Sequence, residues 1–301
     1  MEEIEKPAHI KDTKVIEIPG INGLSKTRGC EKAPGKVLDV LKNEIYSKES
    51  GESIDYDSLK IEGVELENSN IEENSKKTYE KSIEIFRNSN EKEKIIFLGG
   101  DHSISYPLTR AFFDYCQSPG DFSGEGGEEE GKVKEPCLIV FDAHPDLMPV
   151  ASGAEDYPNH EEWLRQLVED GFPIENILLV GGRNFDPQES EFIKEKGIKT
   201  MNIEGFFEDL AGGGDMIMEF SQGKELYVSL DIDVVDPAFA PGTGYTEVGG
   251  FSSREFLYLV KRINKIKNLK ALDLVEINPD KDEKHNYRTV RLGARVLGEL
   301  V

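Results

Sequence analysis

The chain has 301 residues and a formal net charge of −23 at pH 7. This excess of negative charge opposes non-specific binding to nucleic acid and to anionic membranes, so we expect neither as a partner. A solvated acidic surface accounts for the charge. Cys30, Cys116 and Cys137 are odd in number and lack metal-ligand spacing, which favours a reducing cytoplasmic compartment.

Apolar runs and amphipathic segments alternate along the chain. In chain order they predict a strand at 15–18, a helix at 34–43, a short edge strand within 44–70, a helix at 72–88, a strand at 95–98, a helix at 107–115, a strand at 137–141, a helix at about 161–169, a strand at 177–180, a helix at 188–196, a strand at 198–201, a helix at 206–219, a strand at 225–230, a helix at 252–265, a strand at 272–275 and a helix at 287–300.

This alternation predicts an α/β fold with a parallel sheet covered by helices on both faces. Apolar runs recur at intervals of about 40 residues, which favours one continuous domain over residues 1–301. The segment at about 118–135 is rich in Gly, Glu and Ser, so we interpret it as a flexible surface insertion in that domain.

Acidic and imidazole side chains gather in three short segments, each directly after an apolar run. These segments are 99–103, 142–146 and 229–233, and they hold two of the five histidines in the chain. In a parallel sheet, ligands collect at the carboxyl ends of the strands, where all three segments fall. Alternate residues of an extended segment project to the same face, so Asp231 can point the same way as Asp233.

Carboxylate combined with imidazole suits Mn²⁺, Zn²⁺, Co²⁺ or Fe²⁺, whereas an all-oxygen shell suits Mg²⁺ or Ca²⁺. The three segments supply enough ligands for two divalent cations. Two such ions can share a hydroxide and lower the pKa of its parent water. The pattern therefore predicts a two-metal hydrolase.

The same segments carry a family resemblance. Gly-Gly-Asp-His-Ser at 99–103, Asp-Ala-His-x-Asp at 142–146 and Ser-x-Asp-x-Asp-x-x-Asp-Pro-x-x-x-Pro-Gly-Thr-Gly at 229–244 resemble the ureohydrolase family of arginase, agmatinase, formimidoylglutamase and their relatives. The resemblance extends to Val-Glu-Ile-Asn-Pro at 275–279. It implies the arginase-deacetylase fold, a three-layer αβα arrangement around a central, mainly parallel eight-stranded sheet.

The resemblance also implies a metal centre with two Mn²⁺ per subunit, for which Zn²⁺, Co²⁺ or Fe²⁺ can substitute. Its ligands would be His102 and Asp146 for one ion, His144 and Asp233 for the other, and Asp142 and Asp231 as bridges. The residue between the second and third ligands of the middle motif varies in the family. Pro145 therefore leaves the ligands intact and would stiffen the turn that presents Asp146.

Two further residues resemble catalytic positions of the family. Glu276 follows the last predicted strand and would hold the guanidinium through charge-assisted hydrogen bonds. His160 lies 14 residues after Asp146, near the position of a proton-shuttling histidine in arginase-like members. It would protonate the leaving amine. The alternative for His160 is a histidine at a helix start with no chemical role.

The sequence determines the rest of the substrate site less well. The segment 182–189 resembles the arginase segment that contacts the substrate α-amino group, which would assign this contact to Asp186 with Glu189 nearby. Asp186 and Glu189 equally fit the cap of a helix that begins at Pro187. The loop 147–159 departs from the arginase pattern for the α-carboxylate and offers only Ser152 and Asn159 as donors. Agmatine and other guanidino or formimino compounds therefore stay open beside L-arginine.

We thus expect a binuclear manganese hydrolase that releases urea and an amine from a guanidino compound by attack of a metal-bridging hydroxide. By analogy with the family, we expect a homo-oligomer, a trimer or hexamer. A formimidoylglutamase-type hydrolase is one alternative. A single-zinc deacetylase of the same fold would need fewer ligands and a His-His pair, which the chain lacks. A catalytically silent homologue with a regulatory or assembly role is the alternative from another class.

Overall fold

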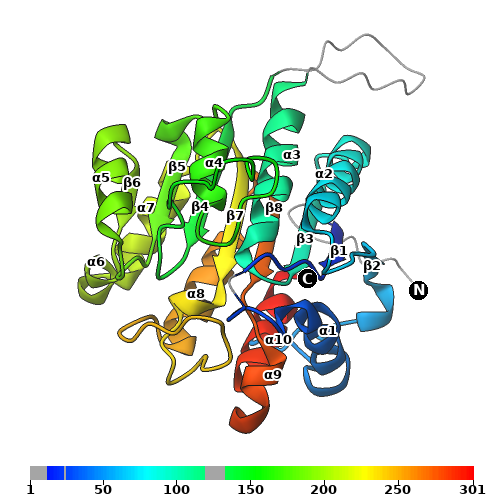
Figure 1. Ribbon diagram of the computed structural model, residues 1–301. Helices are drawn as coiled ribbons and strands as arrows, with labels where there is room; N and C mark the ends of the chain where they lie inside the picture. The colour runs from blue at the N-terminus through cyan, green and yellow to red at the C-terminus, as the bar shows by residue number, and fades with distance from the viewer. Residues whose placement is uncertain (1–11, 24, 119–132) are drawn as a thin grey trace.

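The computed structural model describes residues 12–23, 25–118 and 133–301 (Figure 1). Most of the insertion predicted at 118–135 lies outside the described residues. Among those residues, no helix combines the length and the apolar character needed to cross a bilayer.

An eight-stranded sheet forms the centre of the structure, in the order β2-β1-β3-β8-β7-β4-β5-β6 (Figure 1). The strands are β1 (Asp12–Ile18), β2 (Lys60–Gly63), β3 (Glu93–Gly99), β4 (Pro136–Phe141), β5 (Ile177–Val180), β6 (Lys199–Met201), β7 (Glu225–Asp231) and β8 (Leu269–Val275). All seven strand pairings in this order are parallel, which confirms the predicted sheet. The short edge strand expected within 44–70 is β2.

Strands β3, β8, β7 and β4 lie side by side in the middle of the sheet and are almost entirely buried. Their near-continuous apolar sequences are typical of parallel strands covered on both faces. The three motif segments therefore follow strands of this central group, although β3 and β7 are more than 120 residues apart in sequence.

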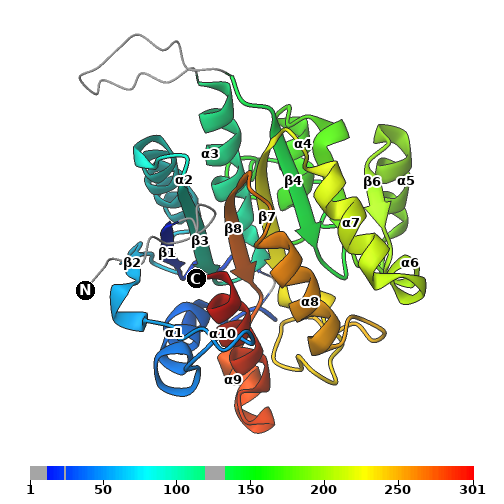
Figure 2. The ribbon, with the colours of Figure 1, turned by 180° about the vertical axis from the view of Figure 1, so that it is seen from behind.

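Helices cover both faces of the sheet. They are α1 (Ala33–Glu44), α2 (Ile71–Asn88), α3 (Ser105–Gln117), α4 (Trp163–Glu169), α5 (Pro187–Lys196), α6 (Ile203–Glu208), α7 (Leu210–Phe220), α8 (Ser253–Ile263), α9 (Pro279–Asp282) and α10 (Arg288–Leu300). One apolar cluster contains side chains of α1, α6, α7, α8 and α10, and a second contains those of α2 to α5. Figure 2 shows α7, α8 and α10 in front of the sheet.

The single helix predicted at 206–219 is wrong, because the segment forms two helices, α6 and α7. Asp209 separates them with φ −152° and ψ 86°, and its side chain accepts a hydrogen bond from the Gly212 N–H. An aspartate that caps a new helix competes with continuation of the old one, and the glycines at 212–214 favour helix only weakly. The short helix α9 was not predicted either.

The start of α8 offers a test of local stability. Ser252 and Glu255 form a reciprocal capping box, in which each side chain accepts a hydrogen bond from the backbone N–H of the other. Ser252→Ala removes one of these bonds and should lower the free energy of unfolding by about 1 kcal/mol in urea titrations. Ser253→Ala, one residue further on, is the matched control and should change stability by less than half of that. Equal effects of the two substitutions would contradict the role of the cap.

Candidate metal centre

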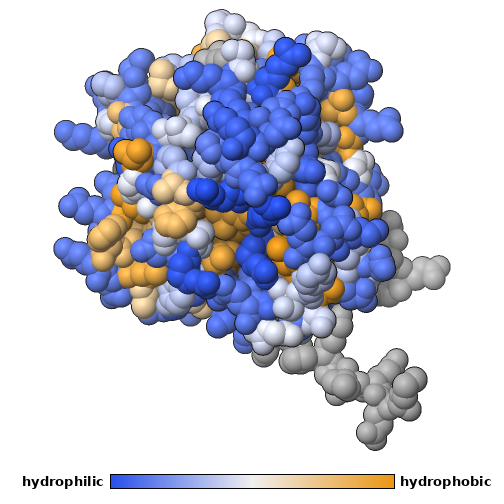
Figure 3. Space-filling view, turned by 90° about the horizontal axis from the view of Figure 1, so that it is seen from below, coloured by the Kyte–Doolittle hydropathy of each residue, from blue (hydrophilic) through white to orange (hydrophobic). Residues whose placement is uncertain are grey.

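The motif side chains converge at the carboxyl ends of the four central strands. His102 follows β3, Asp142 follows β4, Asp231 ends β7 and Glu276 follows β8. A cavity of about 460 Å³ opens over them and is lined by His102, Asp231 and Glu276 among others. Figure 3 views the molecule from below, from the side toward which the central strands run. This face is largely hydrophilic, with apolar residues gathered toward the left of the view.

His102 lies at the centre of the first ligand group. Its Nδ1 atom is 3.0 Å from Asp142 Oδ2, 2.8 Å from Asp146 Oδ2 and 3.2 Å from Asp231 Oδ2. Nevertheless, neither His102 Nδ1 nor Asp142 Oδ2 has a hydrogen-bond partner among the described residues, and both atoms are buried. Nitrogen and oxygen atoms that converge without hydrogen-bonding to one another are better explained as ligands of a metal ion than as an ion pair.

A second group lies beside the first. His144 Nδ1 is 3.0 Å from Asp233 Oδ2 and 3.5 Å from Asp142 Oδ1. The two oxygens of Asp142 thus face different histidines, so this carboxylate belongs to both groups, as a bridging ligand would. The predicted ligands fit two divalent cations, and Asp231 lies on the His102 side of the pair.

Burial makes this cluster of carboxylates unfavourable without cations. Asp142, Asp146, Asp231 and Asp233 are each at most 6% exposed. Burial, followed by the charge of Asp142, raises the pKa of Asp146 to about 7. Burial and the neighbouring Asp233 likewise raise the pKa of Asp231. Two divalent cations would compensate four buried negative charges and keep these groups ionised.

The backbone around the ligands is held in an unusual conformation. Asp146 has φ 52° and Glu276 has φ 63°, both in the left-handed region that non-glycine residues seldom adopt. Such a conformation costs about 1–3 kcal/mol and persists only when its surroundings enforce it. The buried Trp163 donates its indole N–H to Asp146 Oδ2 at 2.8 Å, and the Glu276 N–H donates to Gly100 O at 2.8 Å.

Glu276 lies directly beside the first ligand group, as the family resemblance implies. Its Oε1 atom accepts a hydrogen bond from the His102 backbone N–H at 3.0 Å. Its Oε2 atom accepts one from the buried Cys30 thiol at 3.8 Å. Burial raises the pKa of Glu276, and the charge of Asp101 adds to this effect. A guanidinium ion in the cavity would stabilise the ionised form.

His160 lines the same cavity and is 5% exposed. Neither ring nitrogen has a hydrogen-bond partner among the described residues, and the ring lies 5.2 Å from that of Tyr245. Burial lowers the pKa of His160. The His160 Nε2 atom lies 3.7 Å from Glu161 Oε1. A buried imidazole without a hydrogen bond at either nitrogen is suited to proton transfer, and the role of His160 stays a prediction.

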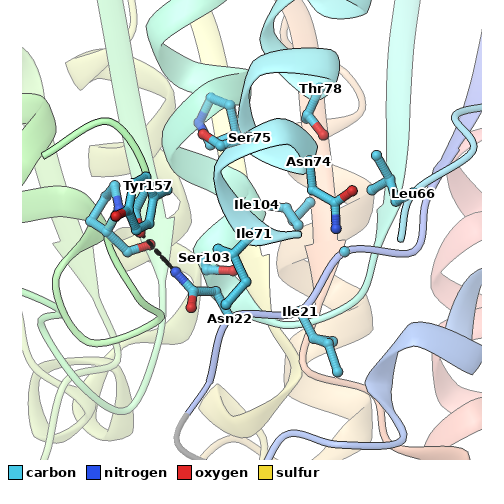
Figure 4. Close-up of a pocket in the computed structure, with 13 residues that line it drawn as sticks. Ile21, Asn22, Leu66, Ile71, Asn74, Ser75, Thr78, Ser103, Ile104 and Tyr157 are labelled. Atoms are coloured by element: carbon cyan, nitrogen blue, oxygen red, sulfur yellow. Dashed lines mark hydrogen bonds between the residues drawn. The ribbon is translucent and has the colours of Figure 1, made fainter. Parts of the chain in front are cut away.

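The loop that carries His160 is anchored by a residue that follows β1. Asn22 Nδ2, after β1, donates to Tyr157 O at 2.8 Å and to Pro158 O at 3.3 Å. Figure 4 shows the first of these bonds beside a small pocket of about 30 Å³ that Ser103 also lines. This pocket has room for about one water molecule, so the loop packs closely at this point.

The two acidic residues at the start of α5 have different surroundings. Glu189 is buried, and its two oxygens accept hydrogen bonds from the backbone N–H groups of Leu147 and Asp186, each at 2.9 Å. Asp186 is exposed at the cavity, and its Oδ1 atom caps α5 through the Gln188 N–H. The helix-cap interpretation therefore holds for both residues. Asp186 retains Oδ2 for a ligand, whereas the oxygens of Glu189 both bind backbone.

Ser152 and Asn159 are not brought to the cavity. Ser152 is exposed, and Asn159 uses its side-chain oxygen to accept a hydrogen bond from the Glu161 N–H at 2.8 Å. Neither is among the described residues that line the cavity. Their role in substrate binding stays a prediction.

Sequence reasoning missed several residues of the outer cavity. Tyr245 and Glu247 line it directly after the third motif, which was the available signal. Glu247 Oε1 lies 3.4 Å from His144 Nε2 and accepts a hydrogen bond from Asn184 Nδ2 at 2.7 Å. Glu161 lines the cavity next to His160.

Comparison with known proteins agrees with this fold. The profile described as "Arginase family" matches residues 11–301, so the chain belongs to the arginase family, whose members are hydrolases that act on the C–N bonds of amidines. Enzymes of this family depend on a binuclear metal centre. The His/Asp groups described above contain residue types that could hold such a centre.

Individual relatives differ in their substrates. The chain is 27% identical to an arginase of Staphylococcus aureus over 81% of this chain and 82% of that protein. It is 31% identical to an agmatinase of Bacillus subtilis over 68% of this chain and 61% of that protein. Alignments to plant arginases span about half the length of those proteins. The proclavaminate amidino hydrolase of Streptomyces clavuligerus has a similar structure, with a TM-score of 0.78 and 25% identity, over 96% of this chain and 90% of that chain.

The bridging arrangement yields a prediction about metal content. Asp231→Ala should lower the Mn²⁺ content below two ions per chain, because the family resemblance makes Asp231 a bridging ligand and its Oδ2 atom lies 3.2 Å from His102 Nδ1. Elemental analysis after dialysis measures this content. Asp186→Asn, in the same cavity but outside both ligand groups, is the control and should keep two ions. Retention of two tightly bound ions by Asp231→Ala would refute the assignment.

Proposed function

We propose that the protein is a binuclear manganese-dependent hydrolase that releases urea and an amine from a guanidino compound, L-arginine or agmatine. One observation carries this proposal: two His/Asp groups that share Asp142 lie at the base of a cavity that Glu276 and His160 also line. When bound, the two ions act as Lewis acids that generate a nucleophile from water near neutral pH.

Glu276 and His160 have the remaining roles in the reaction. The Glu276 carboxylate holds the guanidinium through charge-assisted hydrogen bonds and so orients its carbon toward the ligand groups. As the central carbon becomes tetrahedral, the guanidino group becomes more basic and binds Glu276 more strongly. His160, at the wall of the cavity, delivers the proton that the departing amine requires.

The charge of the outer cavity supports a substrate with a cationic far end. Glu161, Asp186 and Glu247 line this part, and no Lys or Arg is among the described lining residues. A carboxylate there would meet like charge, whereas an ammonium group would be attracted. Within the proposed class, this favours agmatine over L-arginine. It also disfavours the formimidoylglutamase alternative, because formimidoylglutamate carries two carboxylates.

A urea-release screen in the presence of Mn²⁺ tests this proposal. We expect the highest kcat/KM for agmatine, a lower value for L-arginine, and the lowest values for guanidinobutyrate and guanidinopropionate, which end in a carboxylate. Formimidoylglutamate requires a separate formamide assay. A preference for the carboxylate-ended compounds would overturn the substrate assignment. No turnover by the fully loaded protein would favour a catalytically silent homologue.

Glu276→Gln separates substrate binding from metal binding. Loss of the charge-assisted pair should cost roughly 2–4 kcal/mol of transition-state stabilisation, which lowers kcat/KM about 30- to 1000-fold. The Mn²⁺ content should not change, because Glu276 is outside both ligand groups. Loss of metal from this variant would instead indicate that Glu276 is a ligand.

His160→Ala tests proton delivery. Turnover should fall by about 10²–10³-fold, while two Mn²⁺ ions stay bound. Added imidazole should restore part of the rate, because it can occupy the vacated volume and deliver the proton. Normal turnover with only a small loss of thermal stability would assign His160 a structural role.

A further inference from the structure

A chain of buried polar groups lies on the side of the His102 ring opposite Nδ1. His102 Nε2 is 2.9 Å from Ser229 Oγ, and Ser229 Oγ donates to Asp273 Oδ1 at 2.7 Å. Ser229 and Asp273 are register partners on β7 and β8, so the parallel pairing of the two strands aligns them. Ser229 belongs to the third motif, and neither residue has a role in the proposed mechanism.

Asp273 is fully buried and is surrounded by hydroxyl groups. Its Oδ2 atom accepts hydrogen bonds from Ser105 Oγ and Tyr227 Oη, each at 2.9 Å. With Ser229, these make three hydroxyl donors to one carboxylate, and Ser105, Tyr227 and Ser229 are themselves buried. A carboxylate in the middle of a sheet is costly to bury. Three donors compensate for part of this cost and hold the carboxylate in one orientation.

The hydrogen-bond chain from Asp273 through Ser229 determines which nitrogen of His102 carries the proton. Burial raises the pKa of Asp273, whereas the nearby His102 and the three hydroxyl donors lower it. These three hydroxyls donate to the two oxygens of the carboxylate, which only accepts when ionised, so the single proton of the Ser229 hydroxyl points to Asp273. The Ser229 oxygen must then accept from His102, which places the ring proton on Nε2. The lone pair is consequently on Nδ1, the atom that faces Asp142, Asp146 and Asp231.

His144, the histidine of the second group, is held less firmly through its outer nitrogen. The His144 side chain is 22% exposed, and its Nε2 atom lies 3.4 Å from Oε1 of Glu247, whose side chain is 30% exposed. The His102 side chain is 1% exposed. One candidate site is thus supported by a buried hydrogen-bond chain and the other by a partly exposed contact.

We propose that Asp273, acting through Ser229, is a positioning residue that holds His102 in its metal-binding tautomer and makes the His102 site the tighter of the two cation sites. This inference rests on the proposed two-metal function. Hydrogen bonds from the outer nitrogen of a ligating histidine typically change metal affinity by about 10- to 100-fold.

The test is a titration of the metal-free protein with Mn²⁺. Calorimetry measures the affinity of each site, and electron paramagnetic resonance detects coupling between the two bound ions. Wild type should bind two ions with unequal affinities and end with an exchange-coupled spectrum. Ser229→Ala removes the link to Asp273 and should weaken only the tighter site, by about 10- to 100-fold. Asp273→Asn should weaken it further, because an amide can donate to Ser229 and reverse the hydrogen bond to His102.

Thr109→Val is the matched control. Thr109 is fully buried, and its hydroxyl donates to the Ser105 backbone oxygen rather than to Asp273. This variant loses a buried hydroxyl at nearly constant shape, so it should lose stability and keep both Mn²⁺ affinities within about twofold. Thermal unfolding of each metal-free variant separates a folding defect from a binding defect.

Equal weakening of both sites, or no change in Ser229→Ala, would overturn the proposal and leave the two-metal function intact. Failure of wild type to bind Mn²⁺ would overturn the two-metal function itself, so the two failures are distinguishable. If Asp273→Asn does not fold, Ser229→Ala decides the result alone.

Discussion

Asp142 is the residue on which the rest of the site depends. Its two oxygens face two different histidines at the end of a central strand, where hardly any water reaches them. A carboxylate so placed requires positive charge, and the surrounding aspartates increase that requirement. The features around it, including the left-handed backbone of Asp146 and the indole hydrogen bond from Trp163, hold donor atoms in positions that they would not adopt unaided.

The outer part of the cavity is more exposed than its base. At the base, buried groups hold His102 and Asp146 through short hydrogen bonds. Further out, Tyr245, Glu247 and Asp186 are partly or fully exposed and are carried on loops. A rigid base with a variable outer part is consistent with a family in which related proteins are named for arginine, agmatine and guanidinopropionate.

Candidate ligands from all three motifs lie together at the base of the site, as the sequence predicted, whereas the sequence predicted the surrounding residues poorly, for physical reasons. The candidate ligands could be identified because their motifs directly follow apolar strands, so local pattern determines where they lie. Asp273 could not be connected with Ser229 in advance, since their contact depends on the pairing of β7 with β8. The helix break at Asp209 was missed because the apolar spacing continues across it, while the capping hydrogen bond to Gly212 ends one helix and starts another.

The position of β8 has a consequence for the folding of the sheet and of the metal site. It is the last of the eight strands in sequence, yet within the described residues it lies between β3 and β7 and joins β2-β1-β3 to β7-β4-β5-β6. Until β8 inserts, His102 belongs to one half of the sheet, whereas Asp142 and Asp231 belong to the other. Contacts between segments so distant in sequence are slow to form, because they close long loops. A cation bound between His102 and Asp142 therefore marks a chain whose two half-sheets have already joined.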